Sequence, residues 1–260
     1  MSGKVTVVIP FYNPGKYIIT AIESVFDQTY EEWKMLLVND ASTDNSLSFI
    51  TPYLGDPRVR LINNSVNIGQ SKSLNVGLNH VETEFMIQLD ADDWFYPHTL
   101  ETMVREAKAL PEDYAVVSGN ITIYFEDSKG DVHKKRTKKG RGFKDKYDYM
   151  LSNMSVWPRF YRVSALRKVG GWPTDDPFEG RFNEDKRVLF YLIEHFRFYW
   201  IDKALYCHRL HGSNQTNDEA SYRIITRWTV EDALKRWGDH YEAEFEEENG
   251  WIFVRSLKTK

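Results

Sequence analysis

Three carboxylates stand within four positions of one another at the end of an apolar run. Asp90, Asp92 and Asp93 follow residues 85–89 (FMIQL). Carboxylates this close repel one another unless a cation or hydrogen bonds compensate. Mg²⁺ and Mn²⁺ take carboxylate oxygens and often share their coordination shell with substrate phosphates. Acidic residues also initiate turns and cap helices, and Pro97 is near, so the cluster alone leaves a metal site and a turn as alternatives.

A second acidic pair, Glu184-Asp185, precedes a segment predicted to be helical over 186–195. A carboxylate in the first helical turn is favoured by the helix dipole whether or not it takes part in chemistry. It could also serve as a general base. Both interpretations stay open on this pattern alone.

The elements that must position these residues alternate in type. Apolar runs predict strands at 5–10, 35–38, 59–62, 85–89 and 114–118, and helical spacing predicts helices at 17–28, 47–54, 70–79 and 100–110. This alternation is typical of a parallel α/β sheet. Polar residues follow three of the strands, at 12–13, 39–40 and 90–93. Since ligands bind beyond the carboxyl ends of such strands, we expect the three clusters to line one cleft.

The composition narrows the class of protein. The chain has 260 residues, 42% hydrophobic and 28% charged, with a net charge of −4. No global positive charge favours nucleic acid as a partner. The single cysteine, Cys207, excludes a disulfide framework and is expected to be a buried small hydrophobe. Neither a signal sequence nor an apolar run long enough to cross a bilayer is seen, which favours a cytoplasmic protein, with peripheral membrane contact left open.

A basic segment interrupts the α/β pattern. Residues 126–146 hold nine Lys or Arg and are predicted to form a loop or an exposed hairpin. A solvated loop, an anionic acceptor, a phospholipid surface and a donor phosphate are all compatible with this charge. Arg141 stands out because glycines flank it and would allow the loop close to a ligand.

Several motifs occur together in one order. The sequence contains VIPFYN at 8–13, VNDASTD at 38–44, NIG at 67–69, SLNVG at 73–77, LDADD at 89–93, GGW at 170–172, NED at 183–185 and RLHGS at 209–213. In these motifs the chain resembles the family 2 glycosyltransferases of the GT-A fold, over roughly residues 4–216.

The resemblance implies a nucleotide-sugar site in the first half. It assigns the nucleobase and ribose to Pro10, Tyr12 and Asp40, with Asp90 toward the ribose or a metal-bound water. A carboxylate such as Asp40 can accept from the N3–H of a uracil or thymine. Beside the nucleotide the resemblance places Asn67, Gly69 and Lys72.

The resemblance also implies roles for the chemical groups. Asp92 would bind Mn²⁺ or Mg²⁺, with His211 completing the shell. Asp185 would be the general base of a single displacement that inverts the anomeric carbon. Contacts with the phosphates or the acceptor would come from Arg209, Glu184, Trp172 and, less directly, Arg141.

The predicted fold is therefore α/β of the GT-A type, a mostly parallel sheet flanked by helices. Residues 1–216 would form the catalytic domain, with the donor half at 1–98 and the acceptor half at 99–216, and 217–260 a helical extension. The expected function is transfer of a sugar from a UDP-sugar, or a dTDP-sugar, to a hydroxyl of a glycan, lipid-linked glycan or other acceptor in bacterial surface or extracellular glycan synthesis. The alternatives are a nucleotidyltransferase and a non-catalytic sugar-nucleotide-binding module. The motifs specify no oligomeric state.

Overall fold

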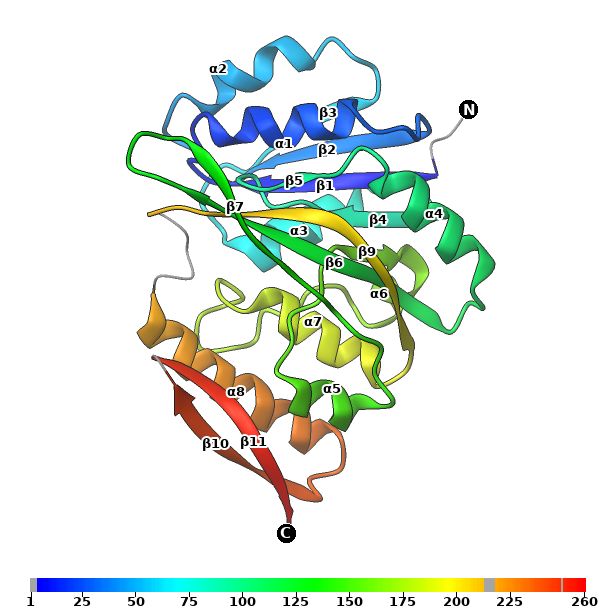
Figure 1. Ribbon diagram of the computed structural model, residues 1–260, viewed down its shortest axis with the longest axis vertical. Coiled ribbons are helices and arrows are strands. Elements are labelled where there is room, and N and C mark those ends of the chain that lie inside the picture. The colour runs from blue at the N-terminus through cyan, green and yellow to red at the C-terminus, as the bar shows by residue number, and fades with distance from the viewer. Residues whose placement is uncertain (1–3, 213–217, 249) are drawn as a thin grey trace.

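The computed structural model describes residues 4–212, 218–248 and 250–260. Ser213 and residues 214–216, predicted from the resemblance to form a loop over the donor, lie outside them. In the described ranges the chain forms one large mixed sheet and a separate two-stranded sheet (Figure 1). The order of the large sheet is β3-β2-β1-β4-β8-β6-β9-β5, and β7 pairs with β6.

The first four strands are parallel, as their alternation with helices predicts. They are β1 (Val5–Phe11), β2 (Trp33–Asn39), β3 (Val59–Asn63) and β4 (Phe85–Gln88). Every residue of β1 and β4 is buried, and β2 is buried at all positions but one. Such continuous apolar runs are typical of parallel strands covered by helices on both faces.

The rest of the large sheet changes direction after β4. Strand β8 (Arg159–Arg162) pairs antiparallel with β4 and with β6 (Tyr114–Glu126). Strand β9 (Arg197–Leu210) runs parallel to β6, and the short β5 (Trp94–Phe95) pairs with the far edge of β9. The basic segment folds back from β6 as the exposed edge strand β7 (Val132–Lys138), so the predicted exposed hairpin is confirmed.

Two layers of helices cover the sheet. Helices α1 (Tyr17–Phe26), α2 (Ser46–Ile50) and α4 (Thr99–Ala109) pack into one hydrophobic core, and a short 3₁₀ turn, η1 (Thr51–Tyr53), follows α2. Helices α3 (Gln70–Asn79), α5 (Lys146–Ser152), α6 (Val163–Lys168) and α7 (Glu184–Ile193) pack into a second core on the opposite face. The burial of both faces leaves the strand ends as the place for polar groups.

The C-terminal extension is only partly helical. Helix α8 (Glu219–Arg236) agrees with the prediction, but the following residues form the hairpin β10 (Tyr241–Glu248) and β11 (Trp251–Thr259). In β11 Ile252 and Val254 are buried and alternate with more exposed neighbours, a period of two that favours a strand. Val254 is tied to α5 because its N–H and C=O both bond to the Asn153 side chain, at 2.8 Å each.

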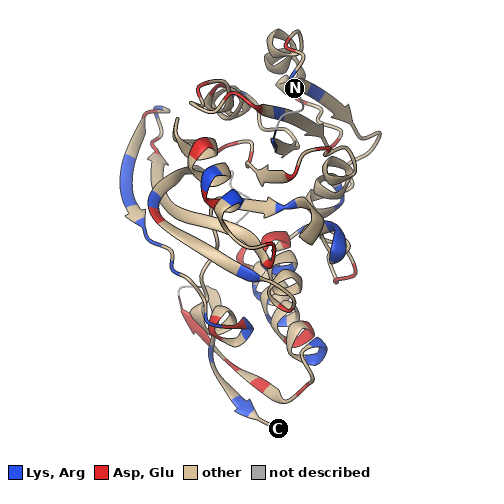
Figure 2. Cartoon of the chain, turned by 90° about the vertical axis from the view of Figure 1, so that its right-hand side faces the viewer, with Lys and Arg blue, Asp and Glu red and all other residues tan. Residues whose placement is uncertain are grey.

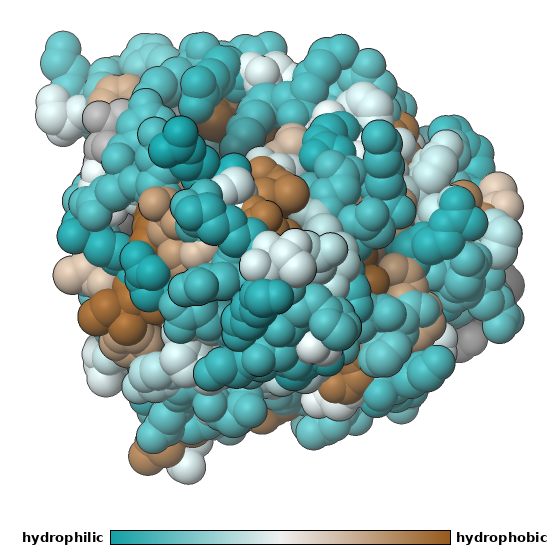
Figure 3. Space-filling model, turned by 90° about the horizontal axis from the view of Figure 1, so that it is seen from below, coloured by the Kyte–Doolittle hydropathy of each residue, from teal (hydrophilic) through white to brown (hydrophobic). Residues whose placement is uncertain are grey.

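No helix in the described ranges is long and apolar enough to cross a bilayer. On the face seen from below in Figure 3, hydrophobic residues form small patches separated by hydrophilic ones.

Candidate functional site

The loops that follow β1 and β2 are joined to each other. The Asn13 side chain accepts from the N–H of Thr43 at 2.7 Å and of Asp44 at 3.2 Å. The N–H of Asn13 donates to Ser42 Oγ at 3.0 Å, and Gly15 N–H donates to the Asp44 carboxylate at 2.8 Å. The carboxyl ends of these two strands therefore form one rim, as the sequence predicts.

Asp40 lies at the end of β2 and holds the loop that enters α3. It is 4% exposed, and its Oδ1 accepts from Ile68 N–H and from Asn64 Nδ2, each at 2.9 Å. Its Oδ2 accepts from the N–H of Gly69 at 2.8 Å. A carboxylate can accept about four hydrogen bonds, so one lone pair on Oδ2 remains for a ligand. Gly69 has a φ of 91°, which side-chain-bearing residues rarely adopt.

The other residues assigned to the nucleotide lie along the same rim. Pro10 is buried within β1, and Tyr12 beyond its end is 51% exposed. Asn67 Oδ1 accepts from Arg181 Nη1 at 2.7 Å, and Lys72 Nζ pairs with Glu179 at 2.7 Å. Both partners come from the 173–183 loop, so this loop closes one side of the rim.

Arg159 of β8 connects two carboxylates that are 95 positions apart in the chain. Its guanidinium, 2% exposed, donates from Nη2 to Asp90 at 2.8 Å and from Nη1 to Asp185 at 3.1 Å. The hydroxyl of Tyr206 donates to Asp90 Oδ2 at 3.3 Å. Asp90 at the end of β4 and Asp185 at the start of α7 therefore face the same space.

Asp92 and His211 meet beside this space. His211 Nε2 lies 2.9 Å from Asp92 Oδ2, and the Tyr17 ring packs on the imidazole with the ring centres 4.5 Å apart. Within residues 4–212, 218–248 and 250–260, no cluster of three or more His, Cys, Asp or Glu side chains is arranged to hold a metal. The pair supplies one oxygen and one nitrogen donor, a set that suits Mn²⁺ better than Mg²⁺.

Asp93 turns away from Asp92 into the sheet. It is 1% exposed, faces His208 Nδ1 at 3.1 Å, and accepts the Arg209 N–H at 2.8 Å. Burial raises the pKa of Asp93 to about 6, and the Asp93 charge raises the pKa of His208 against the lowering effect of burial. Arg209 itself is buried; it donates from Nε to the Asp92 carbonyl at 2.9 Å and pairs with Glu126 at 3.0 Å. Of the three aspartates, Asp93 is thus the structural one.

The first turn of α7 presents Glu184 and Asp185. Lys186 N–H donates to Asp185 Oδ1 at 2.7 Å, which with Arg159 fixes both oxygens of that carboxylate. Burial and the charge of Asp185 raise the pKa of Glu184 to about 8. The ring of Tyr222 in α8 packs edge-on against Phe182, two residues before Glu184, with the ring centres 5.6 Å apart, so the C-terminal extension borders this end of the site.

Trp172 is not available to a ligand, which corrects its predicted contact with phosphates or the acceptor. Its side chain is 1% exposed and packs edge-on against Tyr161. Asn75 of α3 holds the Trp172 backbone through two hydrogen bonds of 2.8 Å. At Gly171 a Cβ would lie 2.3 Å from that amide oxygen, so the GGW motif serves this close packing.

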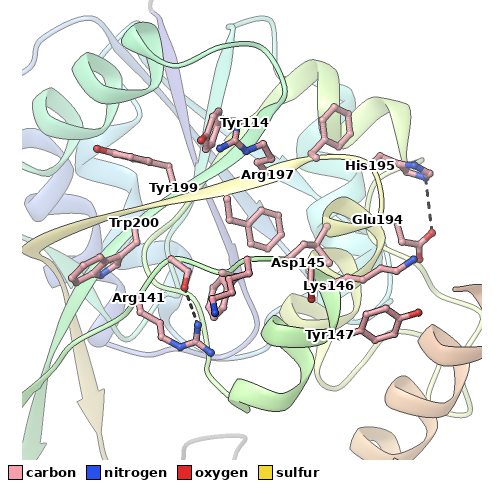
Figure 4. A pocket seen from close by; sticks show the side chains of 16 residues that line it. Tyr114, Arg141, Asp145, Lys146, Tyr147, Glu194, His195, Arg197, Tyr199 and Trp200 are labelled. Atoms are coloured by element: carbon pink, nitrogen blue, oxygen red, sulfur yellow. Dashed lines mark hydrogen bonds and ion pairs between the residues drawn. The ribbon is translucent and has the colours of Figure 1, made fainter. Parts of the chain in front are cut away.

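Arg141 does not contact the carboxylates of the candidate site, Asp90, Asp92 and Asp185, which corrects its predicted contact with phosphates or the acceptor. It pairs with Asp148 through two nitrogens, at 2.7 and 2.8 Å, and lines a cavity of about 890 Å³ (Figure 4). That cavity borders residues 193–200, where β9 begins, whereas His208 and Arg209 at the other end of β9 contact Asp93. The segment that follows α7 and the residues around Arg141 therefore line a cavity that is separate from the site of Asp90 and Asp185.

Sequence reasoning missed the central role of Arg159. No motif includes it, and no spacing in the sequence links it to Asp90 or Asp185. Its signal would have been an arginine in the strand that pairs with the strand before the aspartates. That pairing of β4 with β8 is known only from the structure.

The chain matches the family model described as Glycosyl transferase family 2 over residues 6–202. It is 33% identical over 127 residues to glycosyltransferase GlyG of Streptococcus pneumoniae, a match covering 48% of this chain and 42% of the relative. It is 25% identical over 251 residues to hyaluronan synthase of Pasteurella multocida, covering 91% of this chain and 24% of that protein. The chain thus spans less than half the length of these curated relatives.

Solved structures share the fold. TarS of S. aureus in complex with UDP-GlcNAc superimposes with a TM-score of 0.71 at 20% identity, covering 89% of this chain and 66% of that one. The mannosyltransferase PcManGT from Pyrobaculum calidifontis, in complex with GDP-Man and Mn²⁺, gives a TM-score of 0.63 at 17% identity, covering 94% and 66%. At these identities the likeness concerns the architecture.

Proposed function

The chain belongs to glycosyl transferase family 2, and from this premise we propose that it transfers a sugar from a UDP-sugar to an acceptor hydroxyl with inversion at the anomeric carbon. The observation that carries the proposal is the Arg159 bridge, which faces Asp90 and Asp185 toward one space. An inverting transfer needs a base on the face of the anomeric carbon opposite the leaving diphosphate; we assign donor binding to Asp90 and the base to Asp185. UDP is the first choice because TarS, with the same architecture, is seen with UDP-GlcNAc and with UDP.

The nucleotide would lie on the rim of β1 and β2. Tyr12 is exposed there and offers a ring to the base, and the lone pair left on Asp40 Oδ2 could accept the N3–H of uracil. Asn67 and Lys72 pair with Arg181 and Glu179 of the 173–183 loop, so we assign them the edge of the site and not its centre.

A divalent ion, Mn²⁺ or Mg²⁺, would be held by Asp92 and His211, with the donor diphosphate supplying further oxygens. Once bound, it would neutralise the charge that develops on the leaving diphosphate. Arg209 donates to the Asp92 carbonyl and pairs with Glu126, so it positions the Asp92 ligand, and we keep its guanidinium as a candidate contact for the donor phosphates.

Asp185 would take the proton from the acceptor hydroxyl as that oxygen attacks the anomeric carbon. Arg159 and the Lys186 N–H hold its two oxygens and keep it from turning away. Retention by double displacement would need a nucleophilic carboxylate in addition to the acid and base; we assign Asp90 to the donor and Asp92 to the metal, so the proposal is a single displacement with Asp185 as the base.

The test combines binding and turnover. UDP with Mn²⁺ should raise the melting temperature of the protein, and should do so much less in EDTA. A panel of nucleotide sugars with Mn²⁺ should then reveal slow hydrolysis of one UDP-sugar. Equal shifts with and without metal would remove the metal from this proposal, and hydrolysis restricted to a GDP-sugar or a dTDP-sugar would change the donor.

A further inference from the structure

The basic edge strand β7 lies against the face of the sheet that carries the reactive groups. Side chains that stand opposite each other on neighbouring strands project to the same face. Lys138 pairs with Ile121, which pairs in turn with Tyr206. Tyr206 bonds to Asp90, so Lys138 projects to the side where Asp90 lies.

These three paired residues form a row across β7, β6 and β9, and a second row lies two residues further along the strands. Arg136 pairs with Ile123, and Ile123 pairs with His208, the partner of Asp93. Each row spans two strand spacings, roughly 10 Å in all. Lys138 and Arg136 therefore lie roughly 10 Å from Tyr206 and His208. This places them at the border of the space beside Asp90 and Asp185 where we place the acceptor.

The other cations of the strand point elsewhere. A bulge at Lys135 puts Lys134 opposite Tyr124, whose ring packs on Trp94 on the other face of β6, and leaves Lys135 without a partner in the β6–β7 register. Arg136 and Lys138 therefore project toward the site, Lys134 projects to the other face, and Lys134 and Lys135 together supply a control of equal charge.

These side chains are exposed and unneutralised. Lys139 and Arg141 pair with Asp202 and Asp148, but across the described parts of the chain no carboxylate pairs with Lys134, Lys135, Arg136 or Lys138. Figure 2 shows the resulting basic strip along one edge of the molecule. Because the whole chain has a net charge of −4, this strip is a local feature. Edge strands often carry lysine to block pairing with other chains, but that role needs no cations turned toward Asp90.

A third cation, Lys186, follows Asp185 directly in α7. Burial lowers the pKa of the Lys186 ammonium, Asp185 opposes this, and the charge of Lys138 lowers it further. This effect of Lys138 agrees with the register of β7, which turns Lys138 toward the side of the sheet where Asp90 lies.

We propose that the acceptor is an anionic glycan, whose carboxylate or phosphate groups are bound by Arg136, Lys138 and Lys186 while its hydroxyl reaches Asp185. This inference rests on the proposed function and adds the class of acceptor to it. A flat membrane surface fits less well, because Arg136 and Lys138 project to the catalytic face and not away from the molecule.

The test measures binding of defined oligomers to the full chain in the presence of UDP and Mn²⁺, at about 0.15 M salt. The probes are a hexagalacturonate for carboxylates, a hexamer of glycerol phosphate for phosphates, and cellohexaose as the neutral control. At least one anionic oligomer should bind, and Arg136→Gln/Lys138→Gln should weaken it by about tenfold or more. Lys134→Gln/Lys135→Gln removes the same charge from the same strand and should change it by less than about threefold.

Three results would overturn the proposal: equal binding of cellohexaose, equal losses in the two double variants, or binding to phosphatidylglycerol vesicles with neither anionic oligomer bound. The stronger of the two anionic oligomers identifies the source of the charge. The UDP-dependent rise in melting temperature is read on the same samples. If it is absent the proposed function fails, and if it is present without binding of an anionic oligomer only the acceptor class fails.

Discussion

The two halves of the site hold their polar side chains by different means. On the donor side, Asn13 and Asp40 accept mostly from backbone N–H groups of neighbouring strand-end loops. On the acceptor side, buried arginines bind carboxylates from distant parts of the chain, as Arg159 does with Asp90 and Asp185. The first kind of contact depends on local loop shape, and the second depends on how the strands are ordered in the sheet.

Asp185→Asn should have the largest effect on turnover, and it should impair the acceptor half without changing the donor half. The amide keeps the shape but cannot take the proton, so turnover should fall about 10²–10⁴-fold, while UDP binding in Mn²⁺ stays unchanged. Transfer assays and UDP titration check this. Retained turnover would mean that another group is the base.

Arg159→Met should damage both halves together. It leaves Asp90 and Asp185 without their buried partner, which should lower the free energy of unfolding by about 3–5 kcal/mol. Urea denaturation measures it. The control is Arg162→Met on the same strand, where the pair with Glu84 lies nearer the surface, 10% and 48% exposed, and a smaller loss is expected. Equal losses would deny Arg159 its bridging role.

Asp92→Ala should affect the donor half alone. UDP affinity in Mn²⁺ should fall about 10–100-fold, the size of effect that even groups behind metal ligands produce, and affinity in EDTA should not change. Asp113→Ala, which removes only a surface pair with Arg197, should leave both values as they are. A loss that is equal with and without metal would count against Asp92 as a ligand.

Glu184→Gln gives the smallest effect and concerns the acceptor half. Because the pKa of Glu184 is raised to about 8 from an ordinary value of 4.5, the folded state keeps a proton that the unfolded chain has lost. Stability from this group is complete below pH 4.5 and is lost as the pH rises toward 8. Near pH 8 the variant should therefore be more stable than the original chain, and this difference should disappear toward pH 4.5, measured by denaturation at several pH values. Parallel pH profiles for the two proteins would show that Glu184 titrates normally.

Much of the donor half could be predicted from the sequence. The parallel direction of β1 to β4 and the shared rim of the first two loops follow from apolar runs and turn residues. In the acceptor half, charge density predicted a loop or an exposed hairpin at the basic segment, and the structure has the hairpin. The roles given to single ligand-binding residues remain predictions, because neighbours such as Arg181 and Glu179 already occupy Asn67 and Lys72.

These wrong predictions share one cause: each depends on contacts between parts of the chain that a local sequence pattern does not show. Trp172 was assigned a ligand contact because the GGW motif resembles that of the family, yet its side chain is buried and Asn75 of α3 holds its backbone. Arg141 looked free because glycines flank it, yet Asp148 lies within reach of its guanidinium. The tail was expected to be helical throughout, but the period-two burial of Ile252 and Val254 appears only when β11 packs on α5.

The sequence by itself determined that polar clusters end three parallel strands, because period and strand alternation fix where each strand stops and which way it runs. The tertiary structure alone decided which charges meet there. Strand β8 arrives antiparallel beside β4, and β9 runs beside β6, so Arg159, Tyr206 and Lys138 reach Asp90 or its border from 48 to 116 positions away. Electrostatic interactions act over a few ångströms regardless of separation in the chain, and only the sheet order sets those distances.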